Sequence, residues 1–134
     1  MTGKIKKNKV ISISLNEQNL QDLKMIQHEL GFSGRSEVFR TALRMLITER
    51  NERRAMVGKI EGIILVVNGE HTANEISSVH HKFQDLIKTQ IHNHLNSERC
   101  MNIFVVQGDA KRINEMIDKL SKLENIDYLK FIKS

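Results

Sequence analysis

The chain has 134 residues, enough for one domain or two small ones, and because a small domain has a marginally stable core, we expect oligomerisation. Its formal net charge is +5, and its single cysteine excludes an internal disulfide. No apolar run is long enough to span a membrane, and the basic N-terminus lacks the apolar segment of a secretory signal, so we expect a cytoplasmic protein with no membrane partner.

The charge is distributed unevenly along the chain. All of the basic excess lies in residues 1–54, which hold 11 Lys+Arg and 6 Asp+Glu, whereas five of the six histidines lie after residue 54. This division predicts a surface for nucleic acid or another polyanion in the N-terminal part and a metal site in the C-terminal part. A positive charge of this size is also common on an ordinary solvated surface. The predicted helices and strands are therefore needed to choose between the two interpretations.

Residues 10–50 predict the order strand, helix, turn, helix. Apolar and small polar residues alternate over residues 10–15, which is typical of a short strand. Asn16 can cap a helix whose apolar stripe ends before Gly31, and a second helix begins near residues 33–37. A single short strand leaves its backbone groups unpaired, so we expect it to pair with the same strand of a second copy in an antiparallel ribbon.

Residues 9–50 resemble a ribbon-helix-helix DNA-binding domain, and residues 31–37 resemble the turn between its helices. The resemblance implies that the ribbon enters the major groove of double-stranded DNA while the start of the second helix meets a phosphate. The residues expected on DNA are Lys9, Val10, Ser12, Ser14, Arg35 and Ser36. Lys4, Lys6 and Lys7 would add attraction to the phosphate backbone. The alternative is an ordinary helical hairpin after an extended arm, which the small outward side chains and the basic excess disfavour.

Residues 59–132 predict the order β-α-β-β-α-β. After a polar connector that can continue the second helix, a β-branched strand covers residues 59–67 and a turn follows. We expect a helix over about residues 74–89 capped by Asn74, strands at 91–95 and 101–106, a helix from 108–109, and a last strand at 126–132. This order is ferredoxin-like, as in ACT domains. The predicted fold class is therefore α+β, with domains at residues 1–52 and 53–134.

The soft metal donors of the C-terminal part gather between residues 81 and 100. His81, His92, His94 and Cys100 together make three imidazoles and one thiolate, a complete ligand set for a late transition metal. Two residues apart on a strand, His92 and His94 share a face. We expect Ile91 and Leu95 to face the helices, which leaves the two histidines on the open face and His81 across the sheet. A partner subunit would then supply His81.

The spacing His81-x10-His92-x-His94-x5-Cys100 resembles the nickel site of the nickel-responsive ribbon-helix-helix repressors, the NikR family, and the resemblance covers residues 9–133. It implies Ni²⁺ as the cofactor, a homotetramer built as a dimer of dimers with His81 coming from the neighbouring subunit, and repression of metal uptake genes through a palindromic operator. The family has a second cation position that uses a Glu and an Asp. Glu37 matches the first, whereas Thr41 stands at the second.

Several alternatives stay open at this point. The ligand types suit nickel, copper, cobalt or zinc, and they do not select one of them. Helical periodicity also permits His80 as the fourth donor, and only the family register selects His81. The rival functions are a regulator of the same fold that responds to another metal or a small molecule and, more remotely, a metalloenzyme. Four protein ligands leave no vacancy in a planar site, with only Asp85 and Glu98 as nearby carboxylates, so we expect no enzyme.

Overall fold

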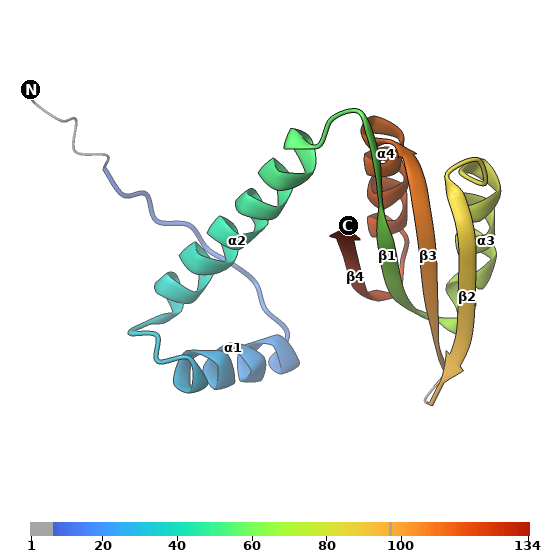
Figure 1. Ribbon diagram of the computed structural model, residues 1–134. Helices are drawn as coiled ribbons and strands as arrows, with labels where there is room; N and C mark the ends of the chain where they lie inside the picture. The colour runs from blue at the N-terminus through green and yellow to red at the C-terminus, as the bar shows by residue number, and fades with distance from the viewer. Residues whose placement is uncertain (1–6, 97) are drawn as a thin grey trace, which may run out of the picture. The chain divides into compact units, whose positions relative to one another are not determined.

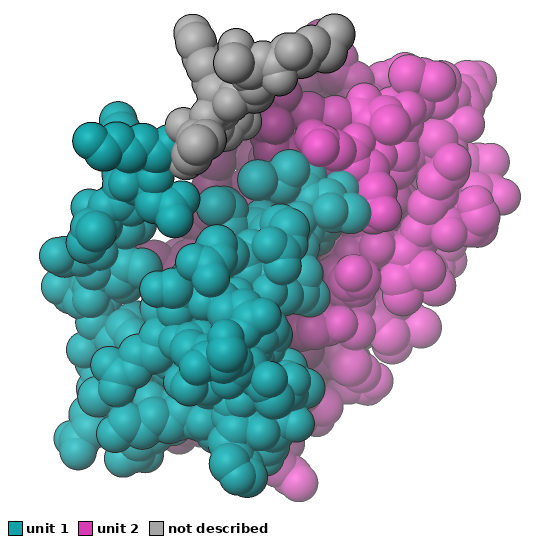
Figure 2. All heavy atoms as spheres, turned by 90° about the vertical axis from the view of Figure 1, so that its left-hand side faces the viewer, with its two compact units in different colours: residues 1–49 teal, residues 50–134 magenta. Residues whose placement is uncertain are grey.

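The computed structural model describes residues 7–96 and 98–134. The chain divides into two compact units, unit 1 with residues 1–49 and unit 2 with residues 50–134, coloured separately in Figure 2. Lys4 and Lys6, which we expect to attract DNA phosphates, lie outside the described residues. Among the described helices, none combines the length and the apolar character needed to cross a membrane.

Unit 1 contains helix α1 (Glu17–Glu29) and the larger part of helix α2 (Arg35–Ala55). Asn16 caps α1, since its Oδ1 accepts a bond from Asn19 N at 2.8 Å, and Gly31 follows the helix with a φ of 69°. The predicted strand at residues 10–15 is absent, because residues 7–16 form neither helix nor strand. Among the described residues no strand lies beside this segment to pair with its backbone groups, and the predicted strand would need such a partner.

The start of α2 is held by Glu37. Its Oε2 accepts bonds from Ser33 N at 2.8 Å and Ser33 Oγ at 2.7 Å, and these bonds hold the pKa of Glu37 below its ordinary value. Four residues on, Thr41 Oγ1 accepts a bond from Arg44 at 3.0 Å. The two residues that correspond to the family's second cation position are therefore engaged within this helix and its cap.

Unit 2 is a four-stranded antiparallel sheet in the order β2-β3-β1-β4. Its strands are β1 (Lys59–Gly69), β2 (Ile87–Leu95), β3 (Arg99–Asp109) and β4 (Ile126–Lys133). Helices α3 (Ala73–Lys82) and α4 (Ala110–Ser121) pack on one face of the sheet, as Figure 1 shows. Together with the short 3₁₀ helix Glu70–Thr72, these elements make the ferredoxin-like fold and confirm that part of the predicted fold class.

Helix α3 is shorter than the predicted helix over residues 74–89. It ends at Lys82, its N-cap is Thr72 rather than Asn74, and Leu86 N donates to Phe83 O at 2.9 Å in the turn that follows. Gln107 N, on β3, then donates to Leu86 O at 2.9 Å. Phe83 and Leu86 are buried in the core. Their apolar spacing therefore reflects burial in a turn, which a helical period cannot distinguish from another turn of helix.

The expected orientation of β2 is wrong. His92 pairs with Asn102 and His94 with Cys100, and residues directly opposite in an antiparallel pair share a face. Asn102 and Cys100 are buried on the face that α3 and α4 cover, so His92 and His94 lie on that face too. Ile91 and Leu95 lie on the open face, 46% and 40% exposed. Apolar residues occupy the open face of this sheet as well, so hydrophobicity does not identify the helix-covered side.

Gly62 on β1 pairs with the end of β4 and lies against the residues before it. A Cβ at this position would overlap the carbonyl oxygen of Ile132 and lie 2.8 Å from Phe131 Cε2. Gly62→Ala is therefore expected to lower the free energy of unfolding by about 1–3 kcal/mol, measured by urea unfolding of the full chain. Gly34→Ala is the control, because a Cβ there meets nothing within 4 Å. Equal unfolding midpoints for the two variants would contradict the close approach of β4.

Candidate metal centre

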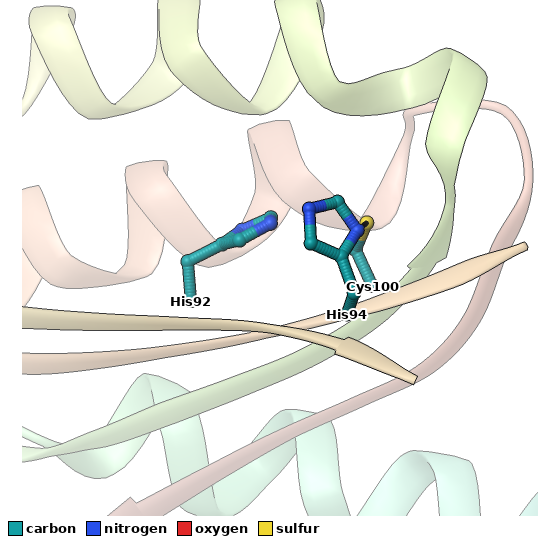
Figure 3. A group of neighbouring side chains, drawn as sticks. All are labelled: His92, His94 and Cys100. Atoms are coloured by element: carbon teal, nitrogen blue, oxygen red, sulfur yellow. Dashed lines mark hydrogen bonds between the residues drawn. The ribbon is translucent and has the colours of Figure 1, made fainter. Parts of the chain in front are cut away.

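Three side chains converge at one end of the β2–β3 hairpin. His92 and His94 on β2 and Cys100 on β3 place their possible ligand atoms within 4.8 Å of one another (Figure 3). The two imidazole rings lie 5.1 Å apart between centroids at an angle of 82°, and Cys100 Sγ lies 3.5 Å from His94 Nδ1. The structure thus brings together three of the four predicted metal ligands without any contribution from a second chain.

The donors differ in their access to solvent. Cys100 is 1% exposed, whereas the side chain of His94 is 74% exposed. The sulfur is therefore shielded from oxidation and exchange by the fold, while the imidazoles remain open toward solvent or a partner. Two imidazoles and one thiolate within this distance fit a late divalent ion such as Ni²⁺, and a further donor can approach from the open side.

His81 does not belong to this group, although its helix covers the same face of the sheet as His92 and His94, contrary to the prediction. It is exposed near the end of α3. The neighbouring His80 is half-buried, with its ring edge-on to Phe104 at 6.1 Å between centroids. Neither histidine joins the three converging donors within the single chain.

Glu70 is the carboxylate that the sequence analysis missed. Its Oε1 lies 3.8 Å from His94 Nδ1, and its backbone N donates to Glu98 O at 3.2 Å. Asp85, which the sequence suggested as a carboxylate near the metal site, accepts a bond from Arg112 at 2.8 Å. Glu70 was missed because 24 positions separate it from His94 in the sequence, and β1 and β2 come together only through β3.

Two buried asparagines next to the donors were missed as well. Asn102 Oδ1 lies 2.9 Å from His92 Nδ1, and Asn102 Nδ2 donates to Asn68 Oδ1 at 3.1 Å. Both asparagines stand at inward positions of strands whose other inward residues are mostly apolar. Buried polar groups require partners, so an asparagine at a core position of a strand is the sequence signal that could have found them.

The six residues expected on DNA lie in unit 1. Lys9, Val10, Ser12 and Ser14 are exposed in the segment before α1, and Arg35 and Ser36 are exposed in the first turn of α2. All six are therefore accessible to a ligand.

The comparison with known families decides the identity of unit 2. Residues 62–133 match the family described as NikR C terminal nickel binding domain. This chain belongs to the NikR family. Membership confirms the predicted resemblance and the expectation of Ni²⁺ as the bound metal.

The similarity extends beyond the matched domain. A protein of Methanocaldococcus jannaschii named as a nickel-responsive regulator is 33% identical over 123 residues, which cover 90% of this chain and 87% of the relative. A similarly named protein of Methanococcus maripaludis is 30% identical over the same shares. These relatives are named as regulators and not as enzymes, which agrees with the prediction that the chain is not an enzyme. The chain thus falls among nickel-responsive regulators.

A solved structure supports the fold alone. An uncharacterized protein from Thermotoga maritima aligns with a TM-score of 0.53 and 16% identity, over 57% of this chain and 98% of its own length.

Proposed function

We propose that this chain is a nickel-dependent DNA-binding transcriptional regulator that represses metal uptake genes. The observation that carries the proposal is the convergence of His92, His94 and Cys100 within 4.8 Å in a domain of the NikR family. Residues 53–134 would form the regulatory domain and residues 1–52 the DNA-binding domain. The protein would act in the cytoplasm, where its DNA is.

The exposed apolar residues of unit 1 support a dimeric ribbon-helix-helix domain. Leu23 is its one buried apolar residue among those described, and many others are exposed: Val10, Ile11, Ile13, Leu15, Met25, Ile26, Leu30, Leu43, Met45, Leu46 and Ile47. Two helices with so little buried apolar surface cannot offset the loss of chain entropy. A second copy would cover these residues and would pair residues 10–15 with its own equivalent segment.

In such a dimer the small and basic residues of the ribbon would meet DNA. Alternation places Val10, Ser12 and Ser14 opposite to Ile11, Ile13 and Leu15, so that the first set faces the major groove while the second faces the helices. Lys9 would contact the phosphate backbone. Arg35 and Ser36 would present the start of α2 to a phosphate, where free backbone N–H groups favour an anion.

The solvent exposure of the two imidazoles supports a metal site that is shared between two subunits. His92, His94 and Cys100 come from one chain, and we propose that His81 of the partner subunit completes the set in a dimer of dimers. His81 is exposed and is therefore available to a neighbour. Bound nickel would supply strong directional bonds that join two subunits. Nickel in the site would favour the arrangement of the tetramer in which its two ribbons reach both halves of a palindromic operator.

Fluorescence anisotropy with the full chain tests this function. DNA selected from a random-sequence pool in the presence of Ni²⁺ is titrated with protein, with nickel and with a chelator. We expect nickel to tighten binding by about 5–150-fold, the usual range of allosteric coupling. Equal affinity in both conditions would contradict nickel-dependent regulation. Stronger tightening by Cu²⁺ or Zn²⁺ would favour a regulator of the same fold that responds to another metal.

A further inference from the structure

A chain of hydrogen bonds runs from the core of the sheet to His92. Asn68 Nδ2 donates to Gly69 O at 2.9 Å, and Asn102 Nδ2 donates to Asn68 Oδ1 at 3.1 Å. Asn102 Oδ1 then lies 2.9 Å from His92 Nδ1. We call Gly69, Asn68 and Asn102 the amide relay. It links β1 through β3 to one of the predicted nickel ligands on β2.

The backbone carbonyl at one end sets the direction of every bond in the amide relay. A carbonyl oxygen only accepts, so Asn68 must turn its NH₂ group toward Gly69 and its oxygen toward Asn102. Asn102 must then donate to Asn68 and turn its own oxygen toward His92. An amide oxygen also only accepts, so His92 Nδ1 has to carry the proton. The lone pair of the neutral imidazole is thereby left on Nε2.

Burial and a second donor hold the amide relay in this state. Asn68 is 0% exposed and Asn102 is 1% exposed, so water cannot replace their bonds. Gln90 Nε2 donates to Asn102 Oδ1 at 3.1 Å and occupies a second lone pair of that oxygen. Rotation of the Asn102 amide would break three bonds, and a buried polar group without a partner costs about 1–3 kcal/mol.

We propose that Asn68 and Asn102 are positioning residues that keep His92 in the Nδ1–H tautomer and so present its Nε2 lone pair to nickel. The proposal rests on the proposed role of His92 as a ligand. Neutral histidine in water prefers the other tautomer, with the proton on Nε2, which cannot bind a metal through that atom. Partners of this kind orient the ring and make the ligand nitrogen more basic.

Nitrogen NMR of the metal-free full chain tests the tautomer directly. Long-range proton–nitrogen spectra are recorded with labelled histidine at about pH 8.5, about two units above the ordinary pKa of imidazole. The His92 signals are identified by their loss in His92→Gln. We expect the Nδ1–H tautomer in the unaltered chain. A predominant Nε2–H tautomer there would overturn the proposal, whatever the variants show.

Three variants separate positioning from stability. Asn102→Leu removes the acceptor, and Asn68→Val removes the anchor of the Asn102 amide, so both should shift His92 toward Nε2–H. Asn102→Asp keeps an acceptor and should keep Nδ1–H. Thr72→Val is the matched control, because Thr72 is 3% exposed and, among the described residues, its hydroxyl donates to Glu124 O at 3.0 Å and to no ligand candidate. It should lower stability and leave the tautomer unchanged.

Nickel affinity, measured by competition with a chelator, completes the test. We expect Asn102→Leu to weaken binding by about 10–100-fold and Thr72→Val to leave it unchanged. Unaltered affinity and tautomer in both Asn102→Leu and Asn68→Val would overturn the proposal. If His92 shows the Nδ1–H tautomer but the unaltered chain binds no nickel, the proposed function fails while the role of the amide relay in setting the tautomer stands.

Discussion

Cys100→Ala is expected to weaken nickel binding by at least about 100-fold, which is about 3 kcal/mol or more. The thiolate is the only sulfur donor in the group of three, and its Sγ lies 3.5 Å from His94 Nδ1. A water molecule can replace the lost donor but binds nickel much more weakly than a thiolate. The dissociation constant follows from chelator competition, and the thiolate-to-metal absorption bands should disappear.

The control for this loss of nickel affinity is a variant of a histidine that lies outside the group of three donors. His71 is exposed in the 3₁₀ helix Glu70–Thr72, and His71→Ala should leave nickel affinity unchanged. Circular dichroism of Cys100→Ala should match the unaltered chain, because a methyl group fits the space of a thiol. If Cys100→Ala kept full affinity while folded, nickel would have to bind elsewhere in the chain.

Ile63→Glu is expected to break the proposed tetramer into smaller species. The open face of the sheet carries large apolar residues on all four strands: Ile63, Ile91, Leu95, Val105, Tyr128 and Ile132. In an assembly that buries this face, a carboxylate at position 63 would lose its hydration without gaining a partner, which costs several kcal/mol. Sedimentation velocity should show the lower mass.

A charge change away from this face serves as the comparison. Lys119 is exposed on α4, and Lys119→Glu alters the net charge without touching the open face of the sheet. It should keep the mass of the unaltered chain. If Ile63→Glu behaved in the same way, the open face would not be the surface through which the tetramer assembles.

The sequence predicted most elements of unit 2 because their patterns are local. The β-branched run of β1 and the apolar stripe of α4 each identify their element without reference to the rest of the chain. The predicted end of α3 was too late, because Phe83 and Leu86 continue the helical spacing. The next strand begins where Gln107 N donates to Leu86 O, and this bond comes from a segment that is distant in the sequence. The predicted ribbon at residues 10–15 would depend on a second chain, and residues 7–16 form no strand in the single copy.

The grouping of the three converging donors could be predicted from the sequence, but their surroundings could not. His92, His94 and Cys100 lie within nine positions on one hairpin, so their spacing alone places them together. Asn68 and Asn102 are 34 positions apart and meet only through the pairing of β1 with β3. The orientation of β2 was also wrong, because alternation shows that His92 and His94 share a face but does not show which face the helices cover.

The central claim is that nickel occupancy and DNA binding are coupled, and a two-way titration tests it most directly. The affinity of the full chain for its selected DNA is measured with and without Ni²⁺, and its affinity for Ni²⁺ is measured with and without that DNA. Thermodynamic linkage requires both affinities to change by the same factor, which we expect to be about 5–150-fold. A nickel affinity that DNA leaves unchanged, together with a DNA affinity that nickel leaves unchanged, would contradict the account.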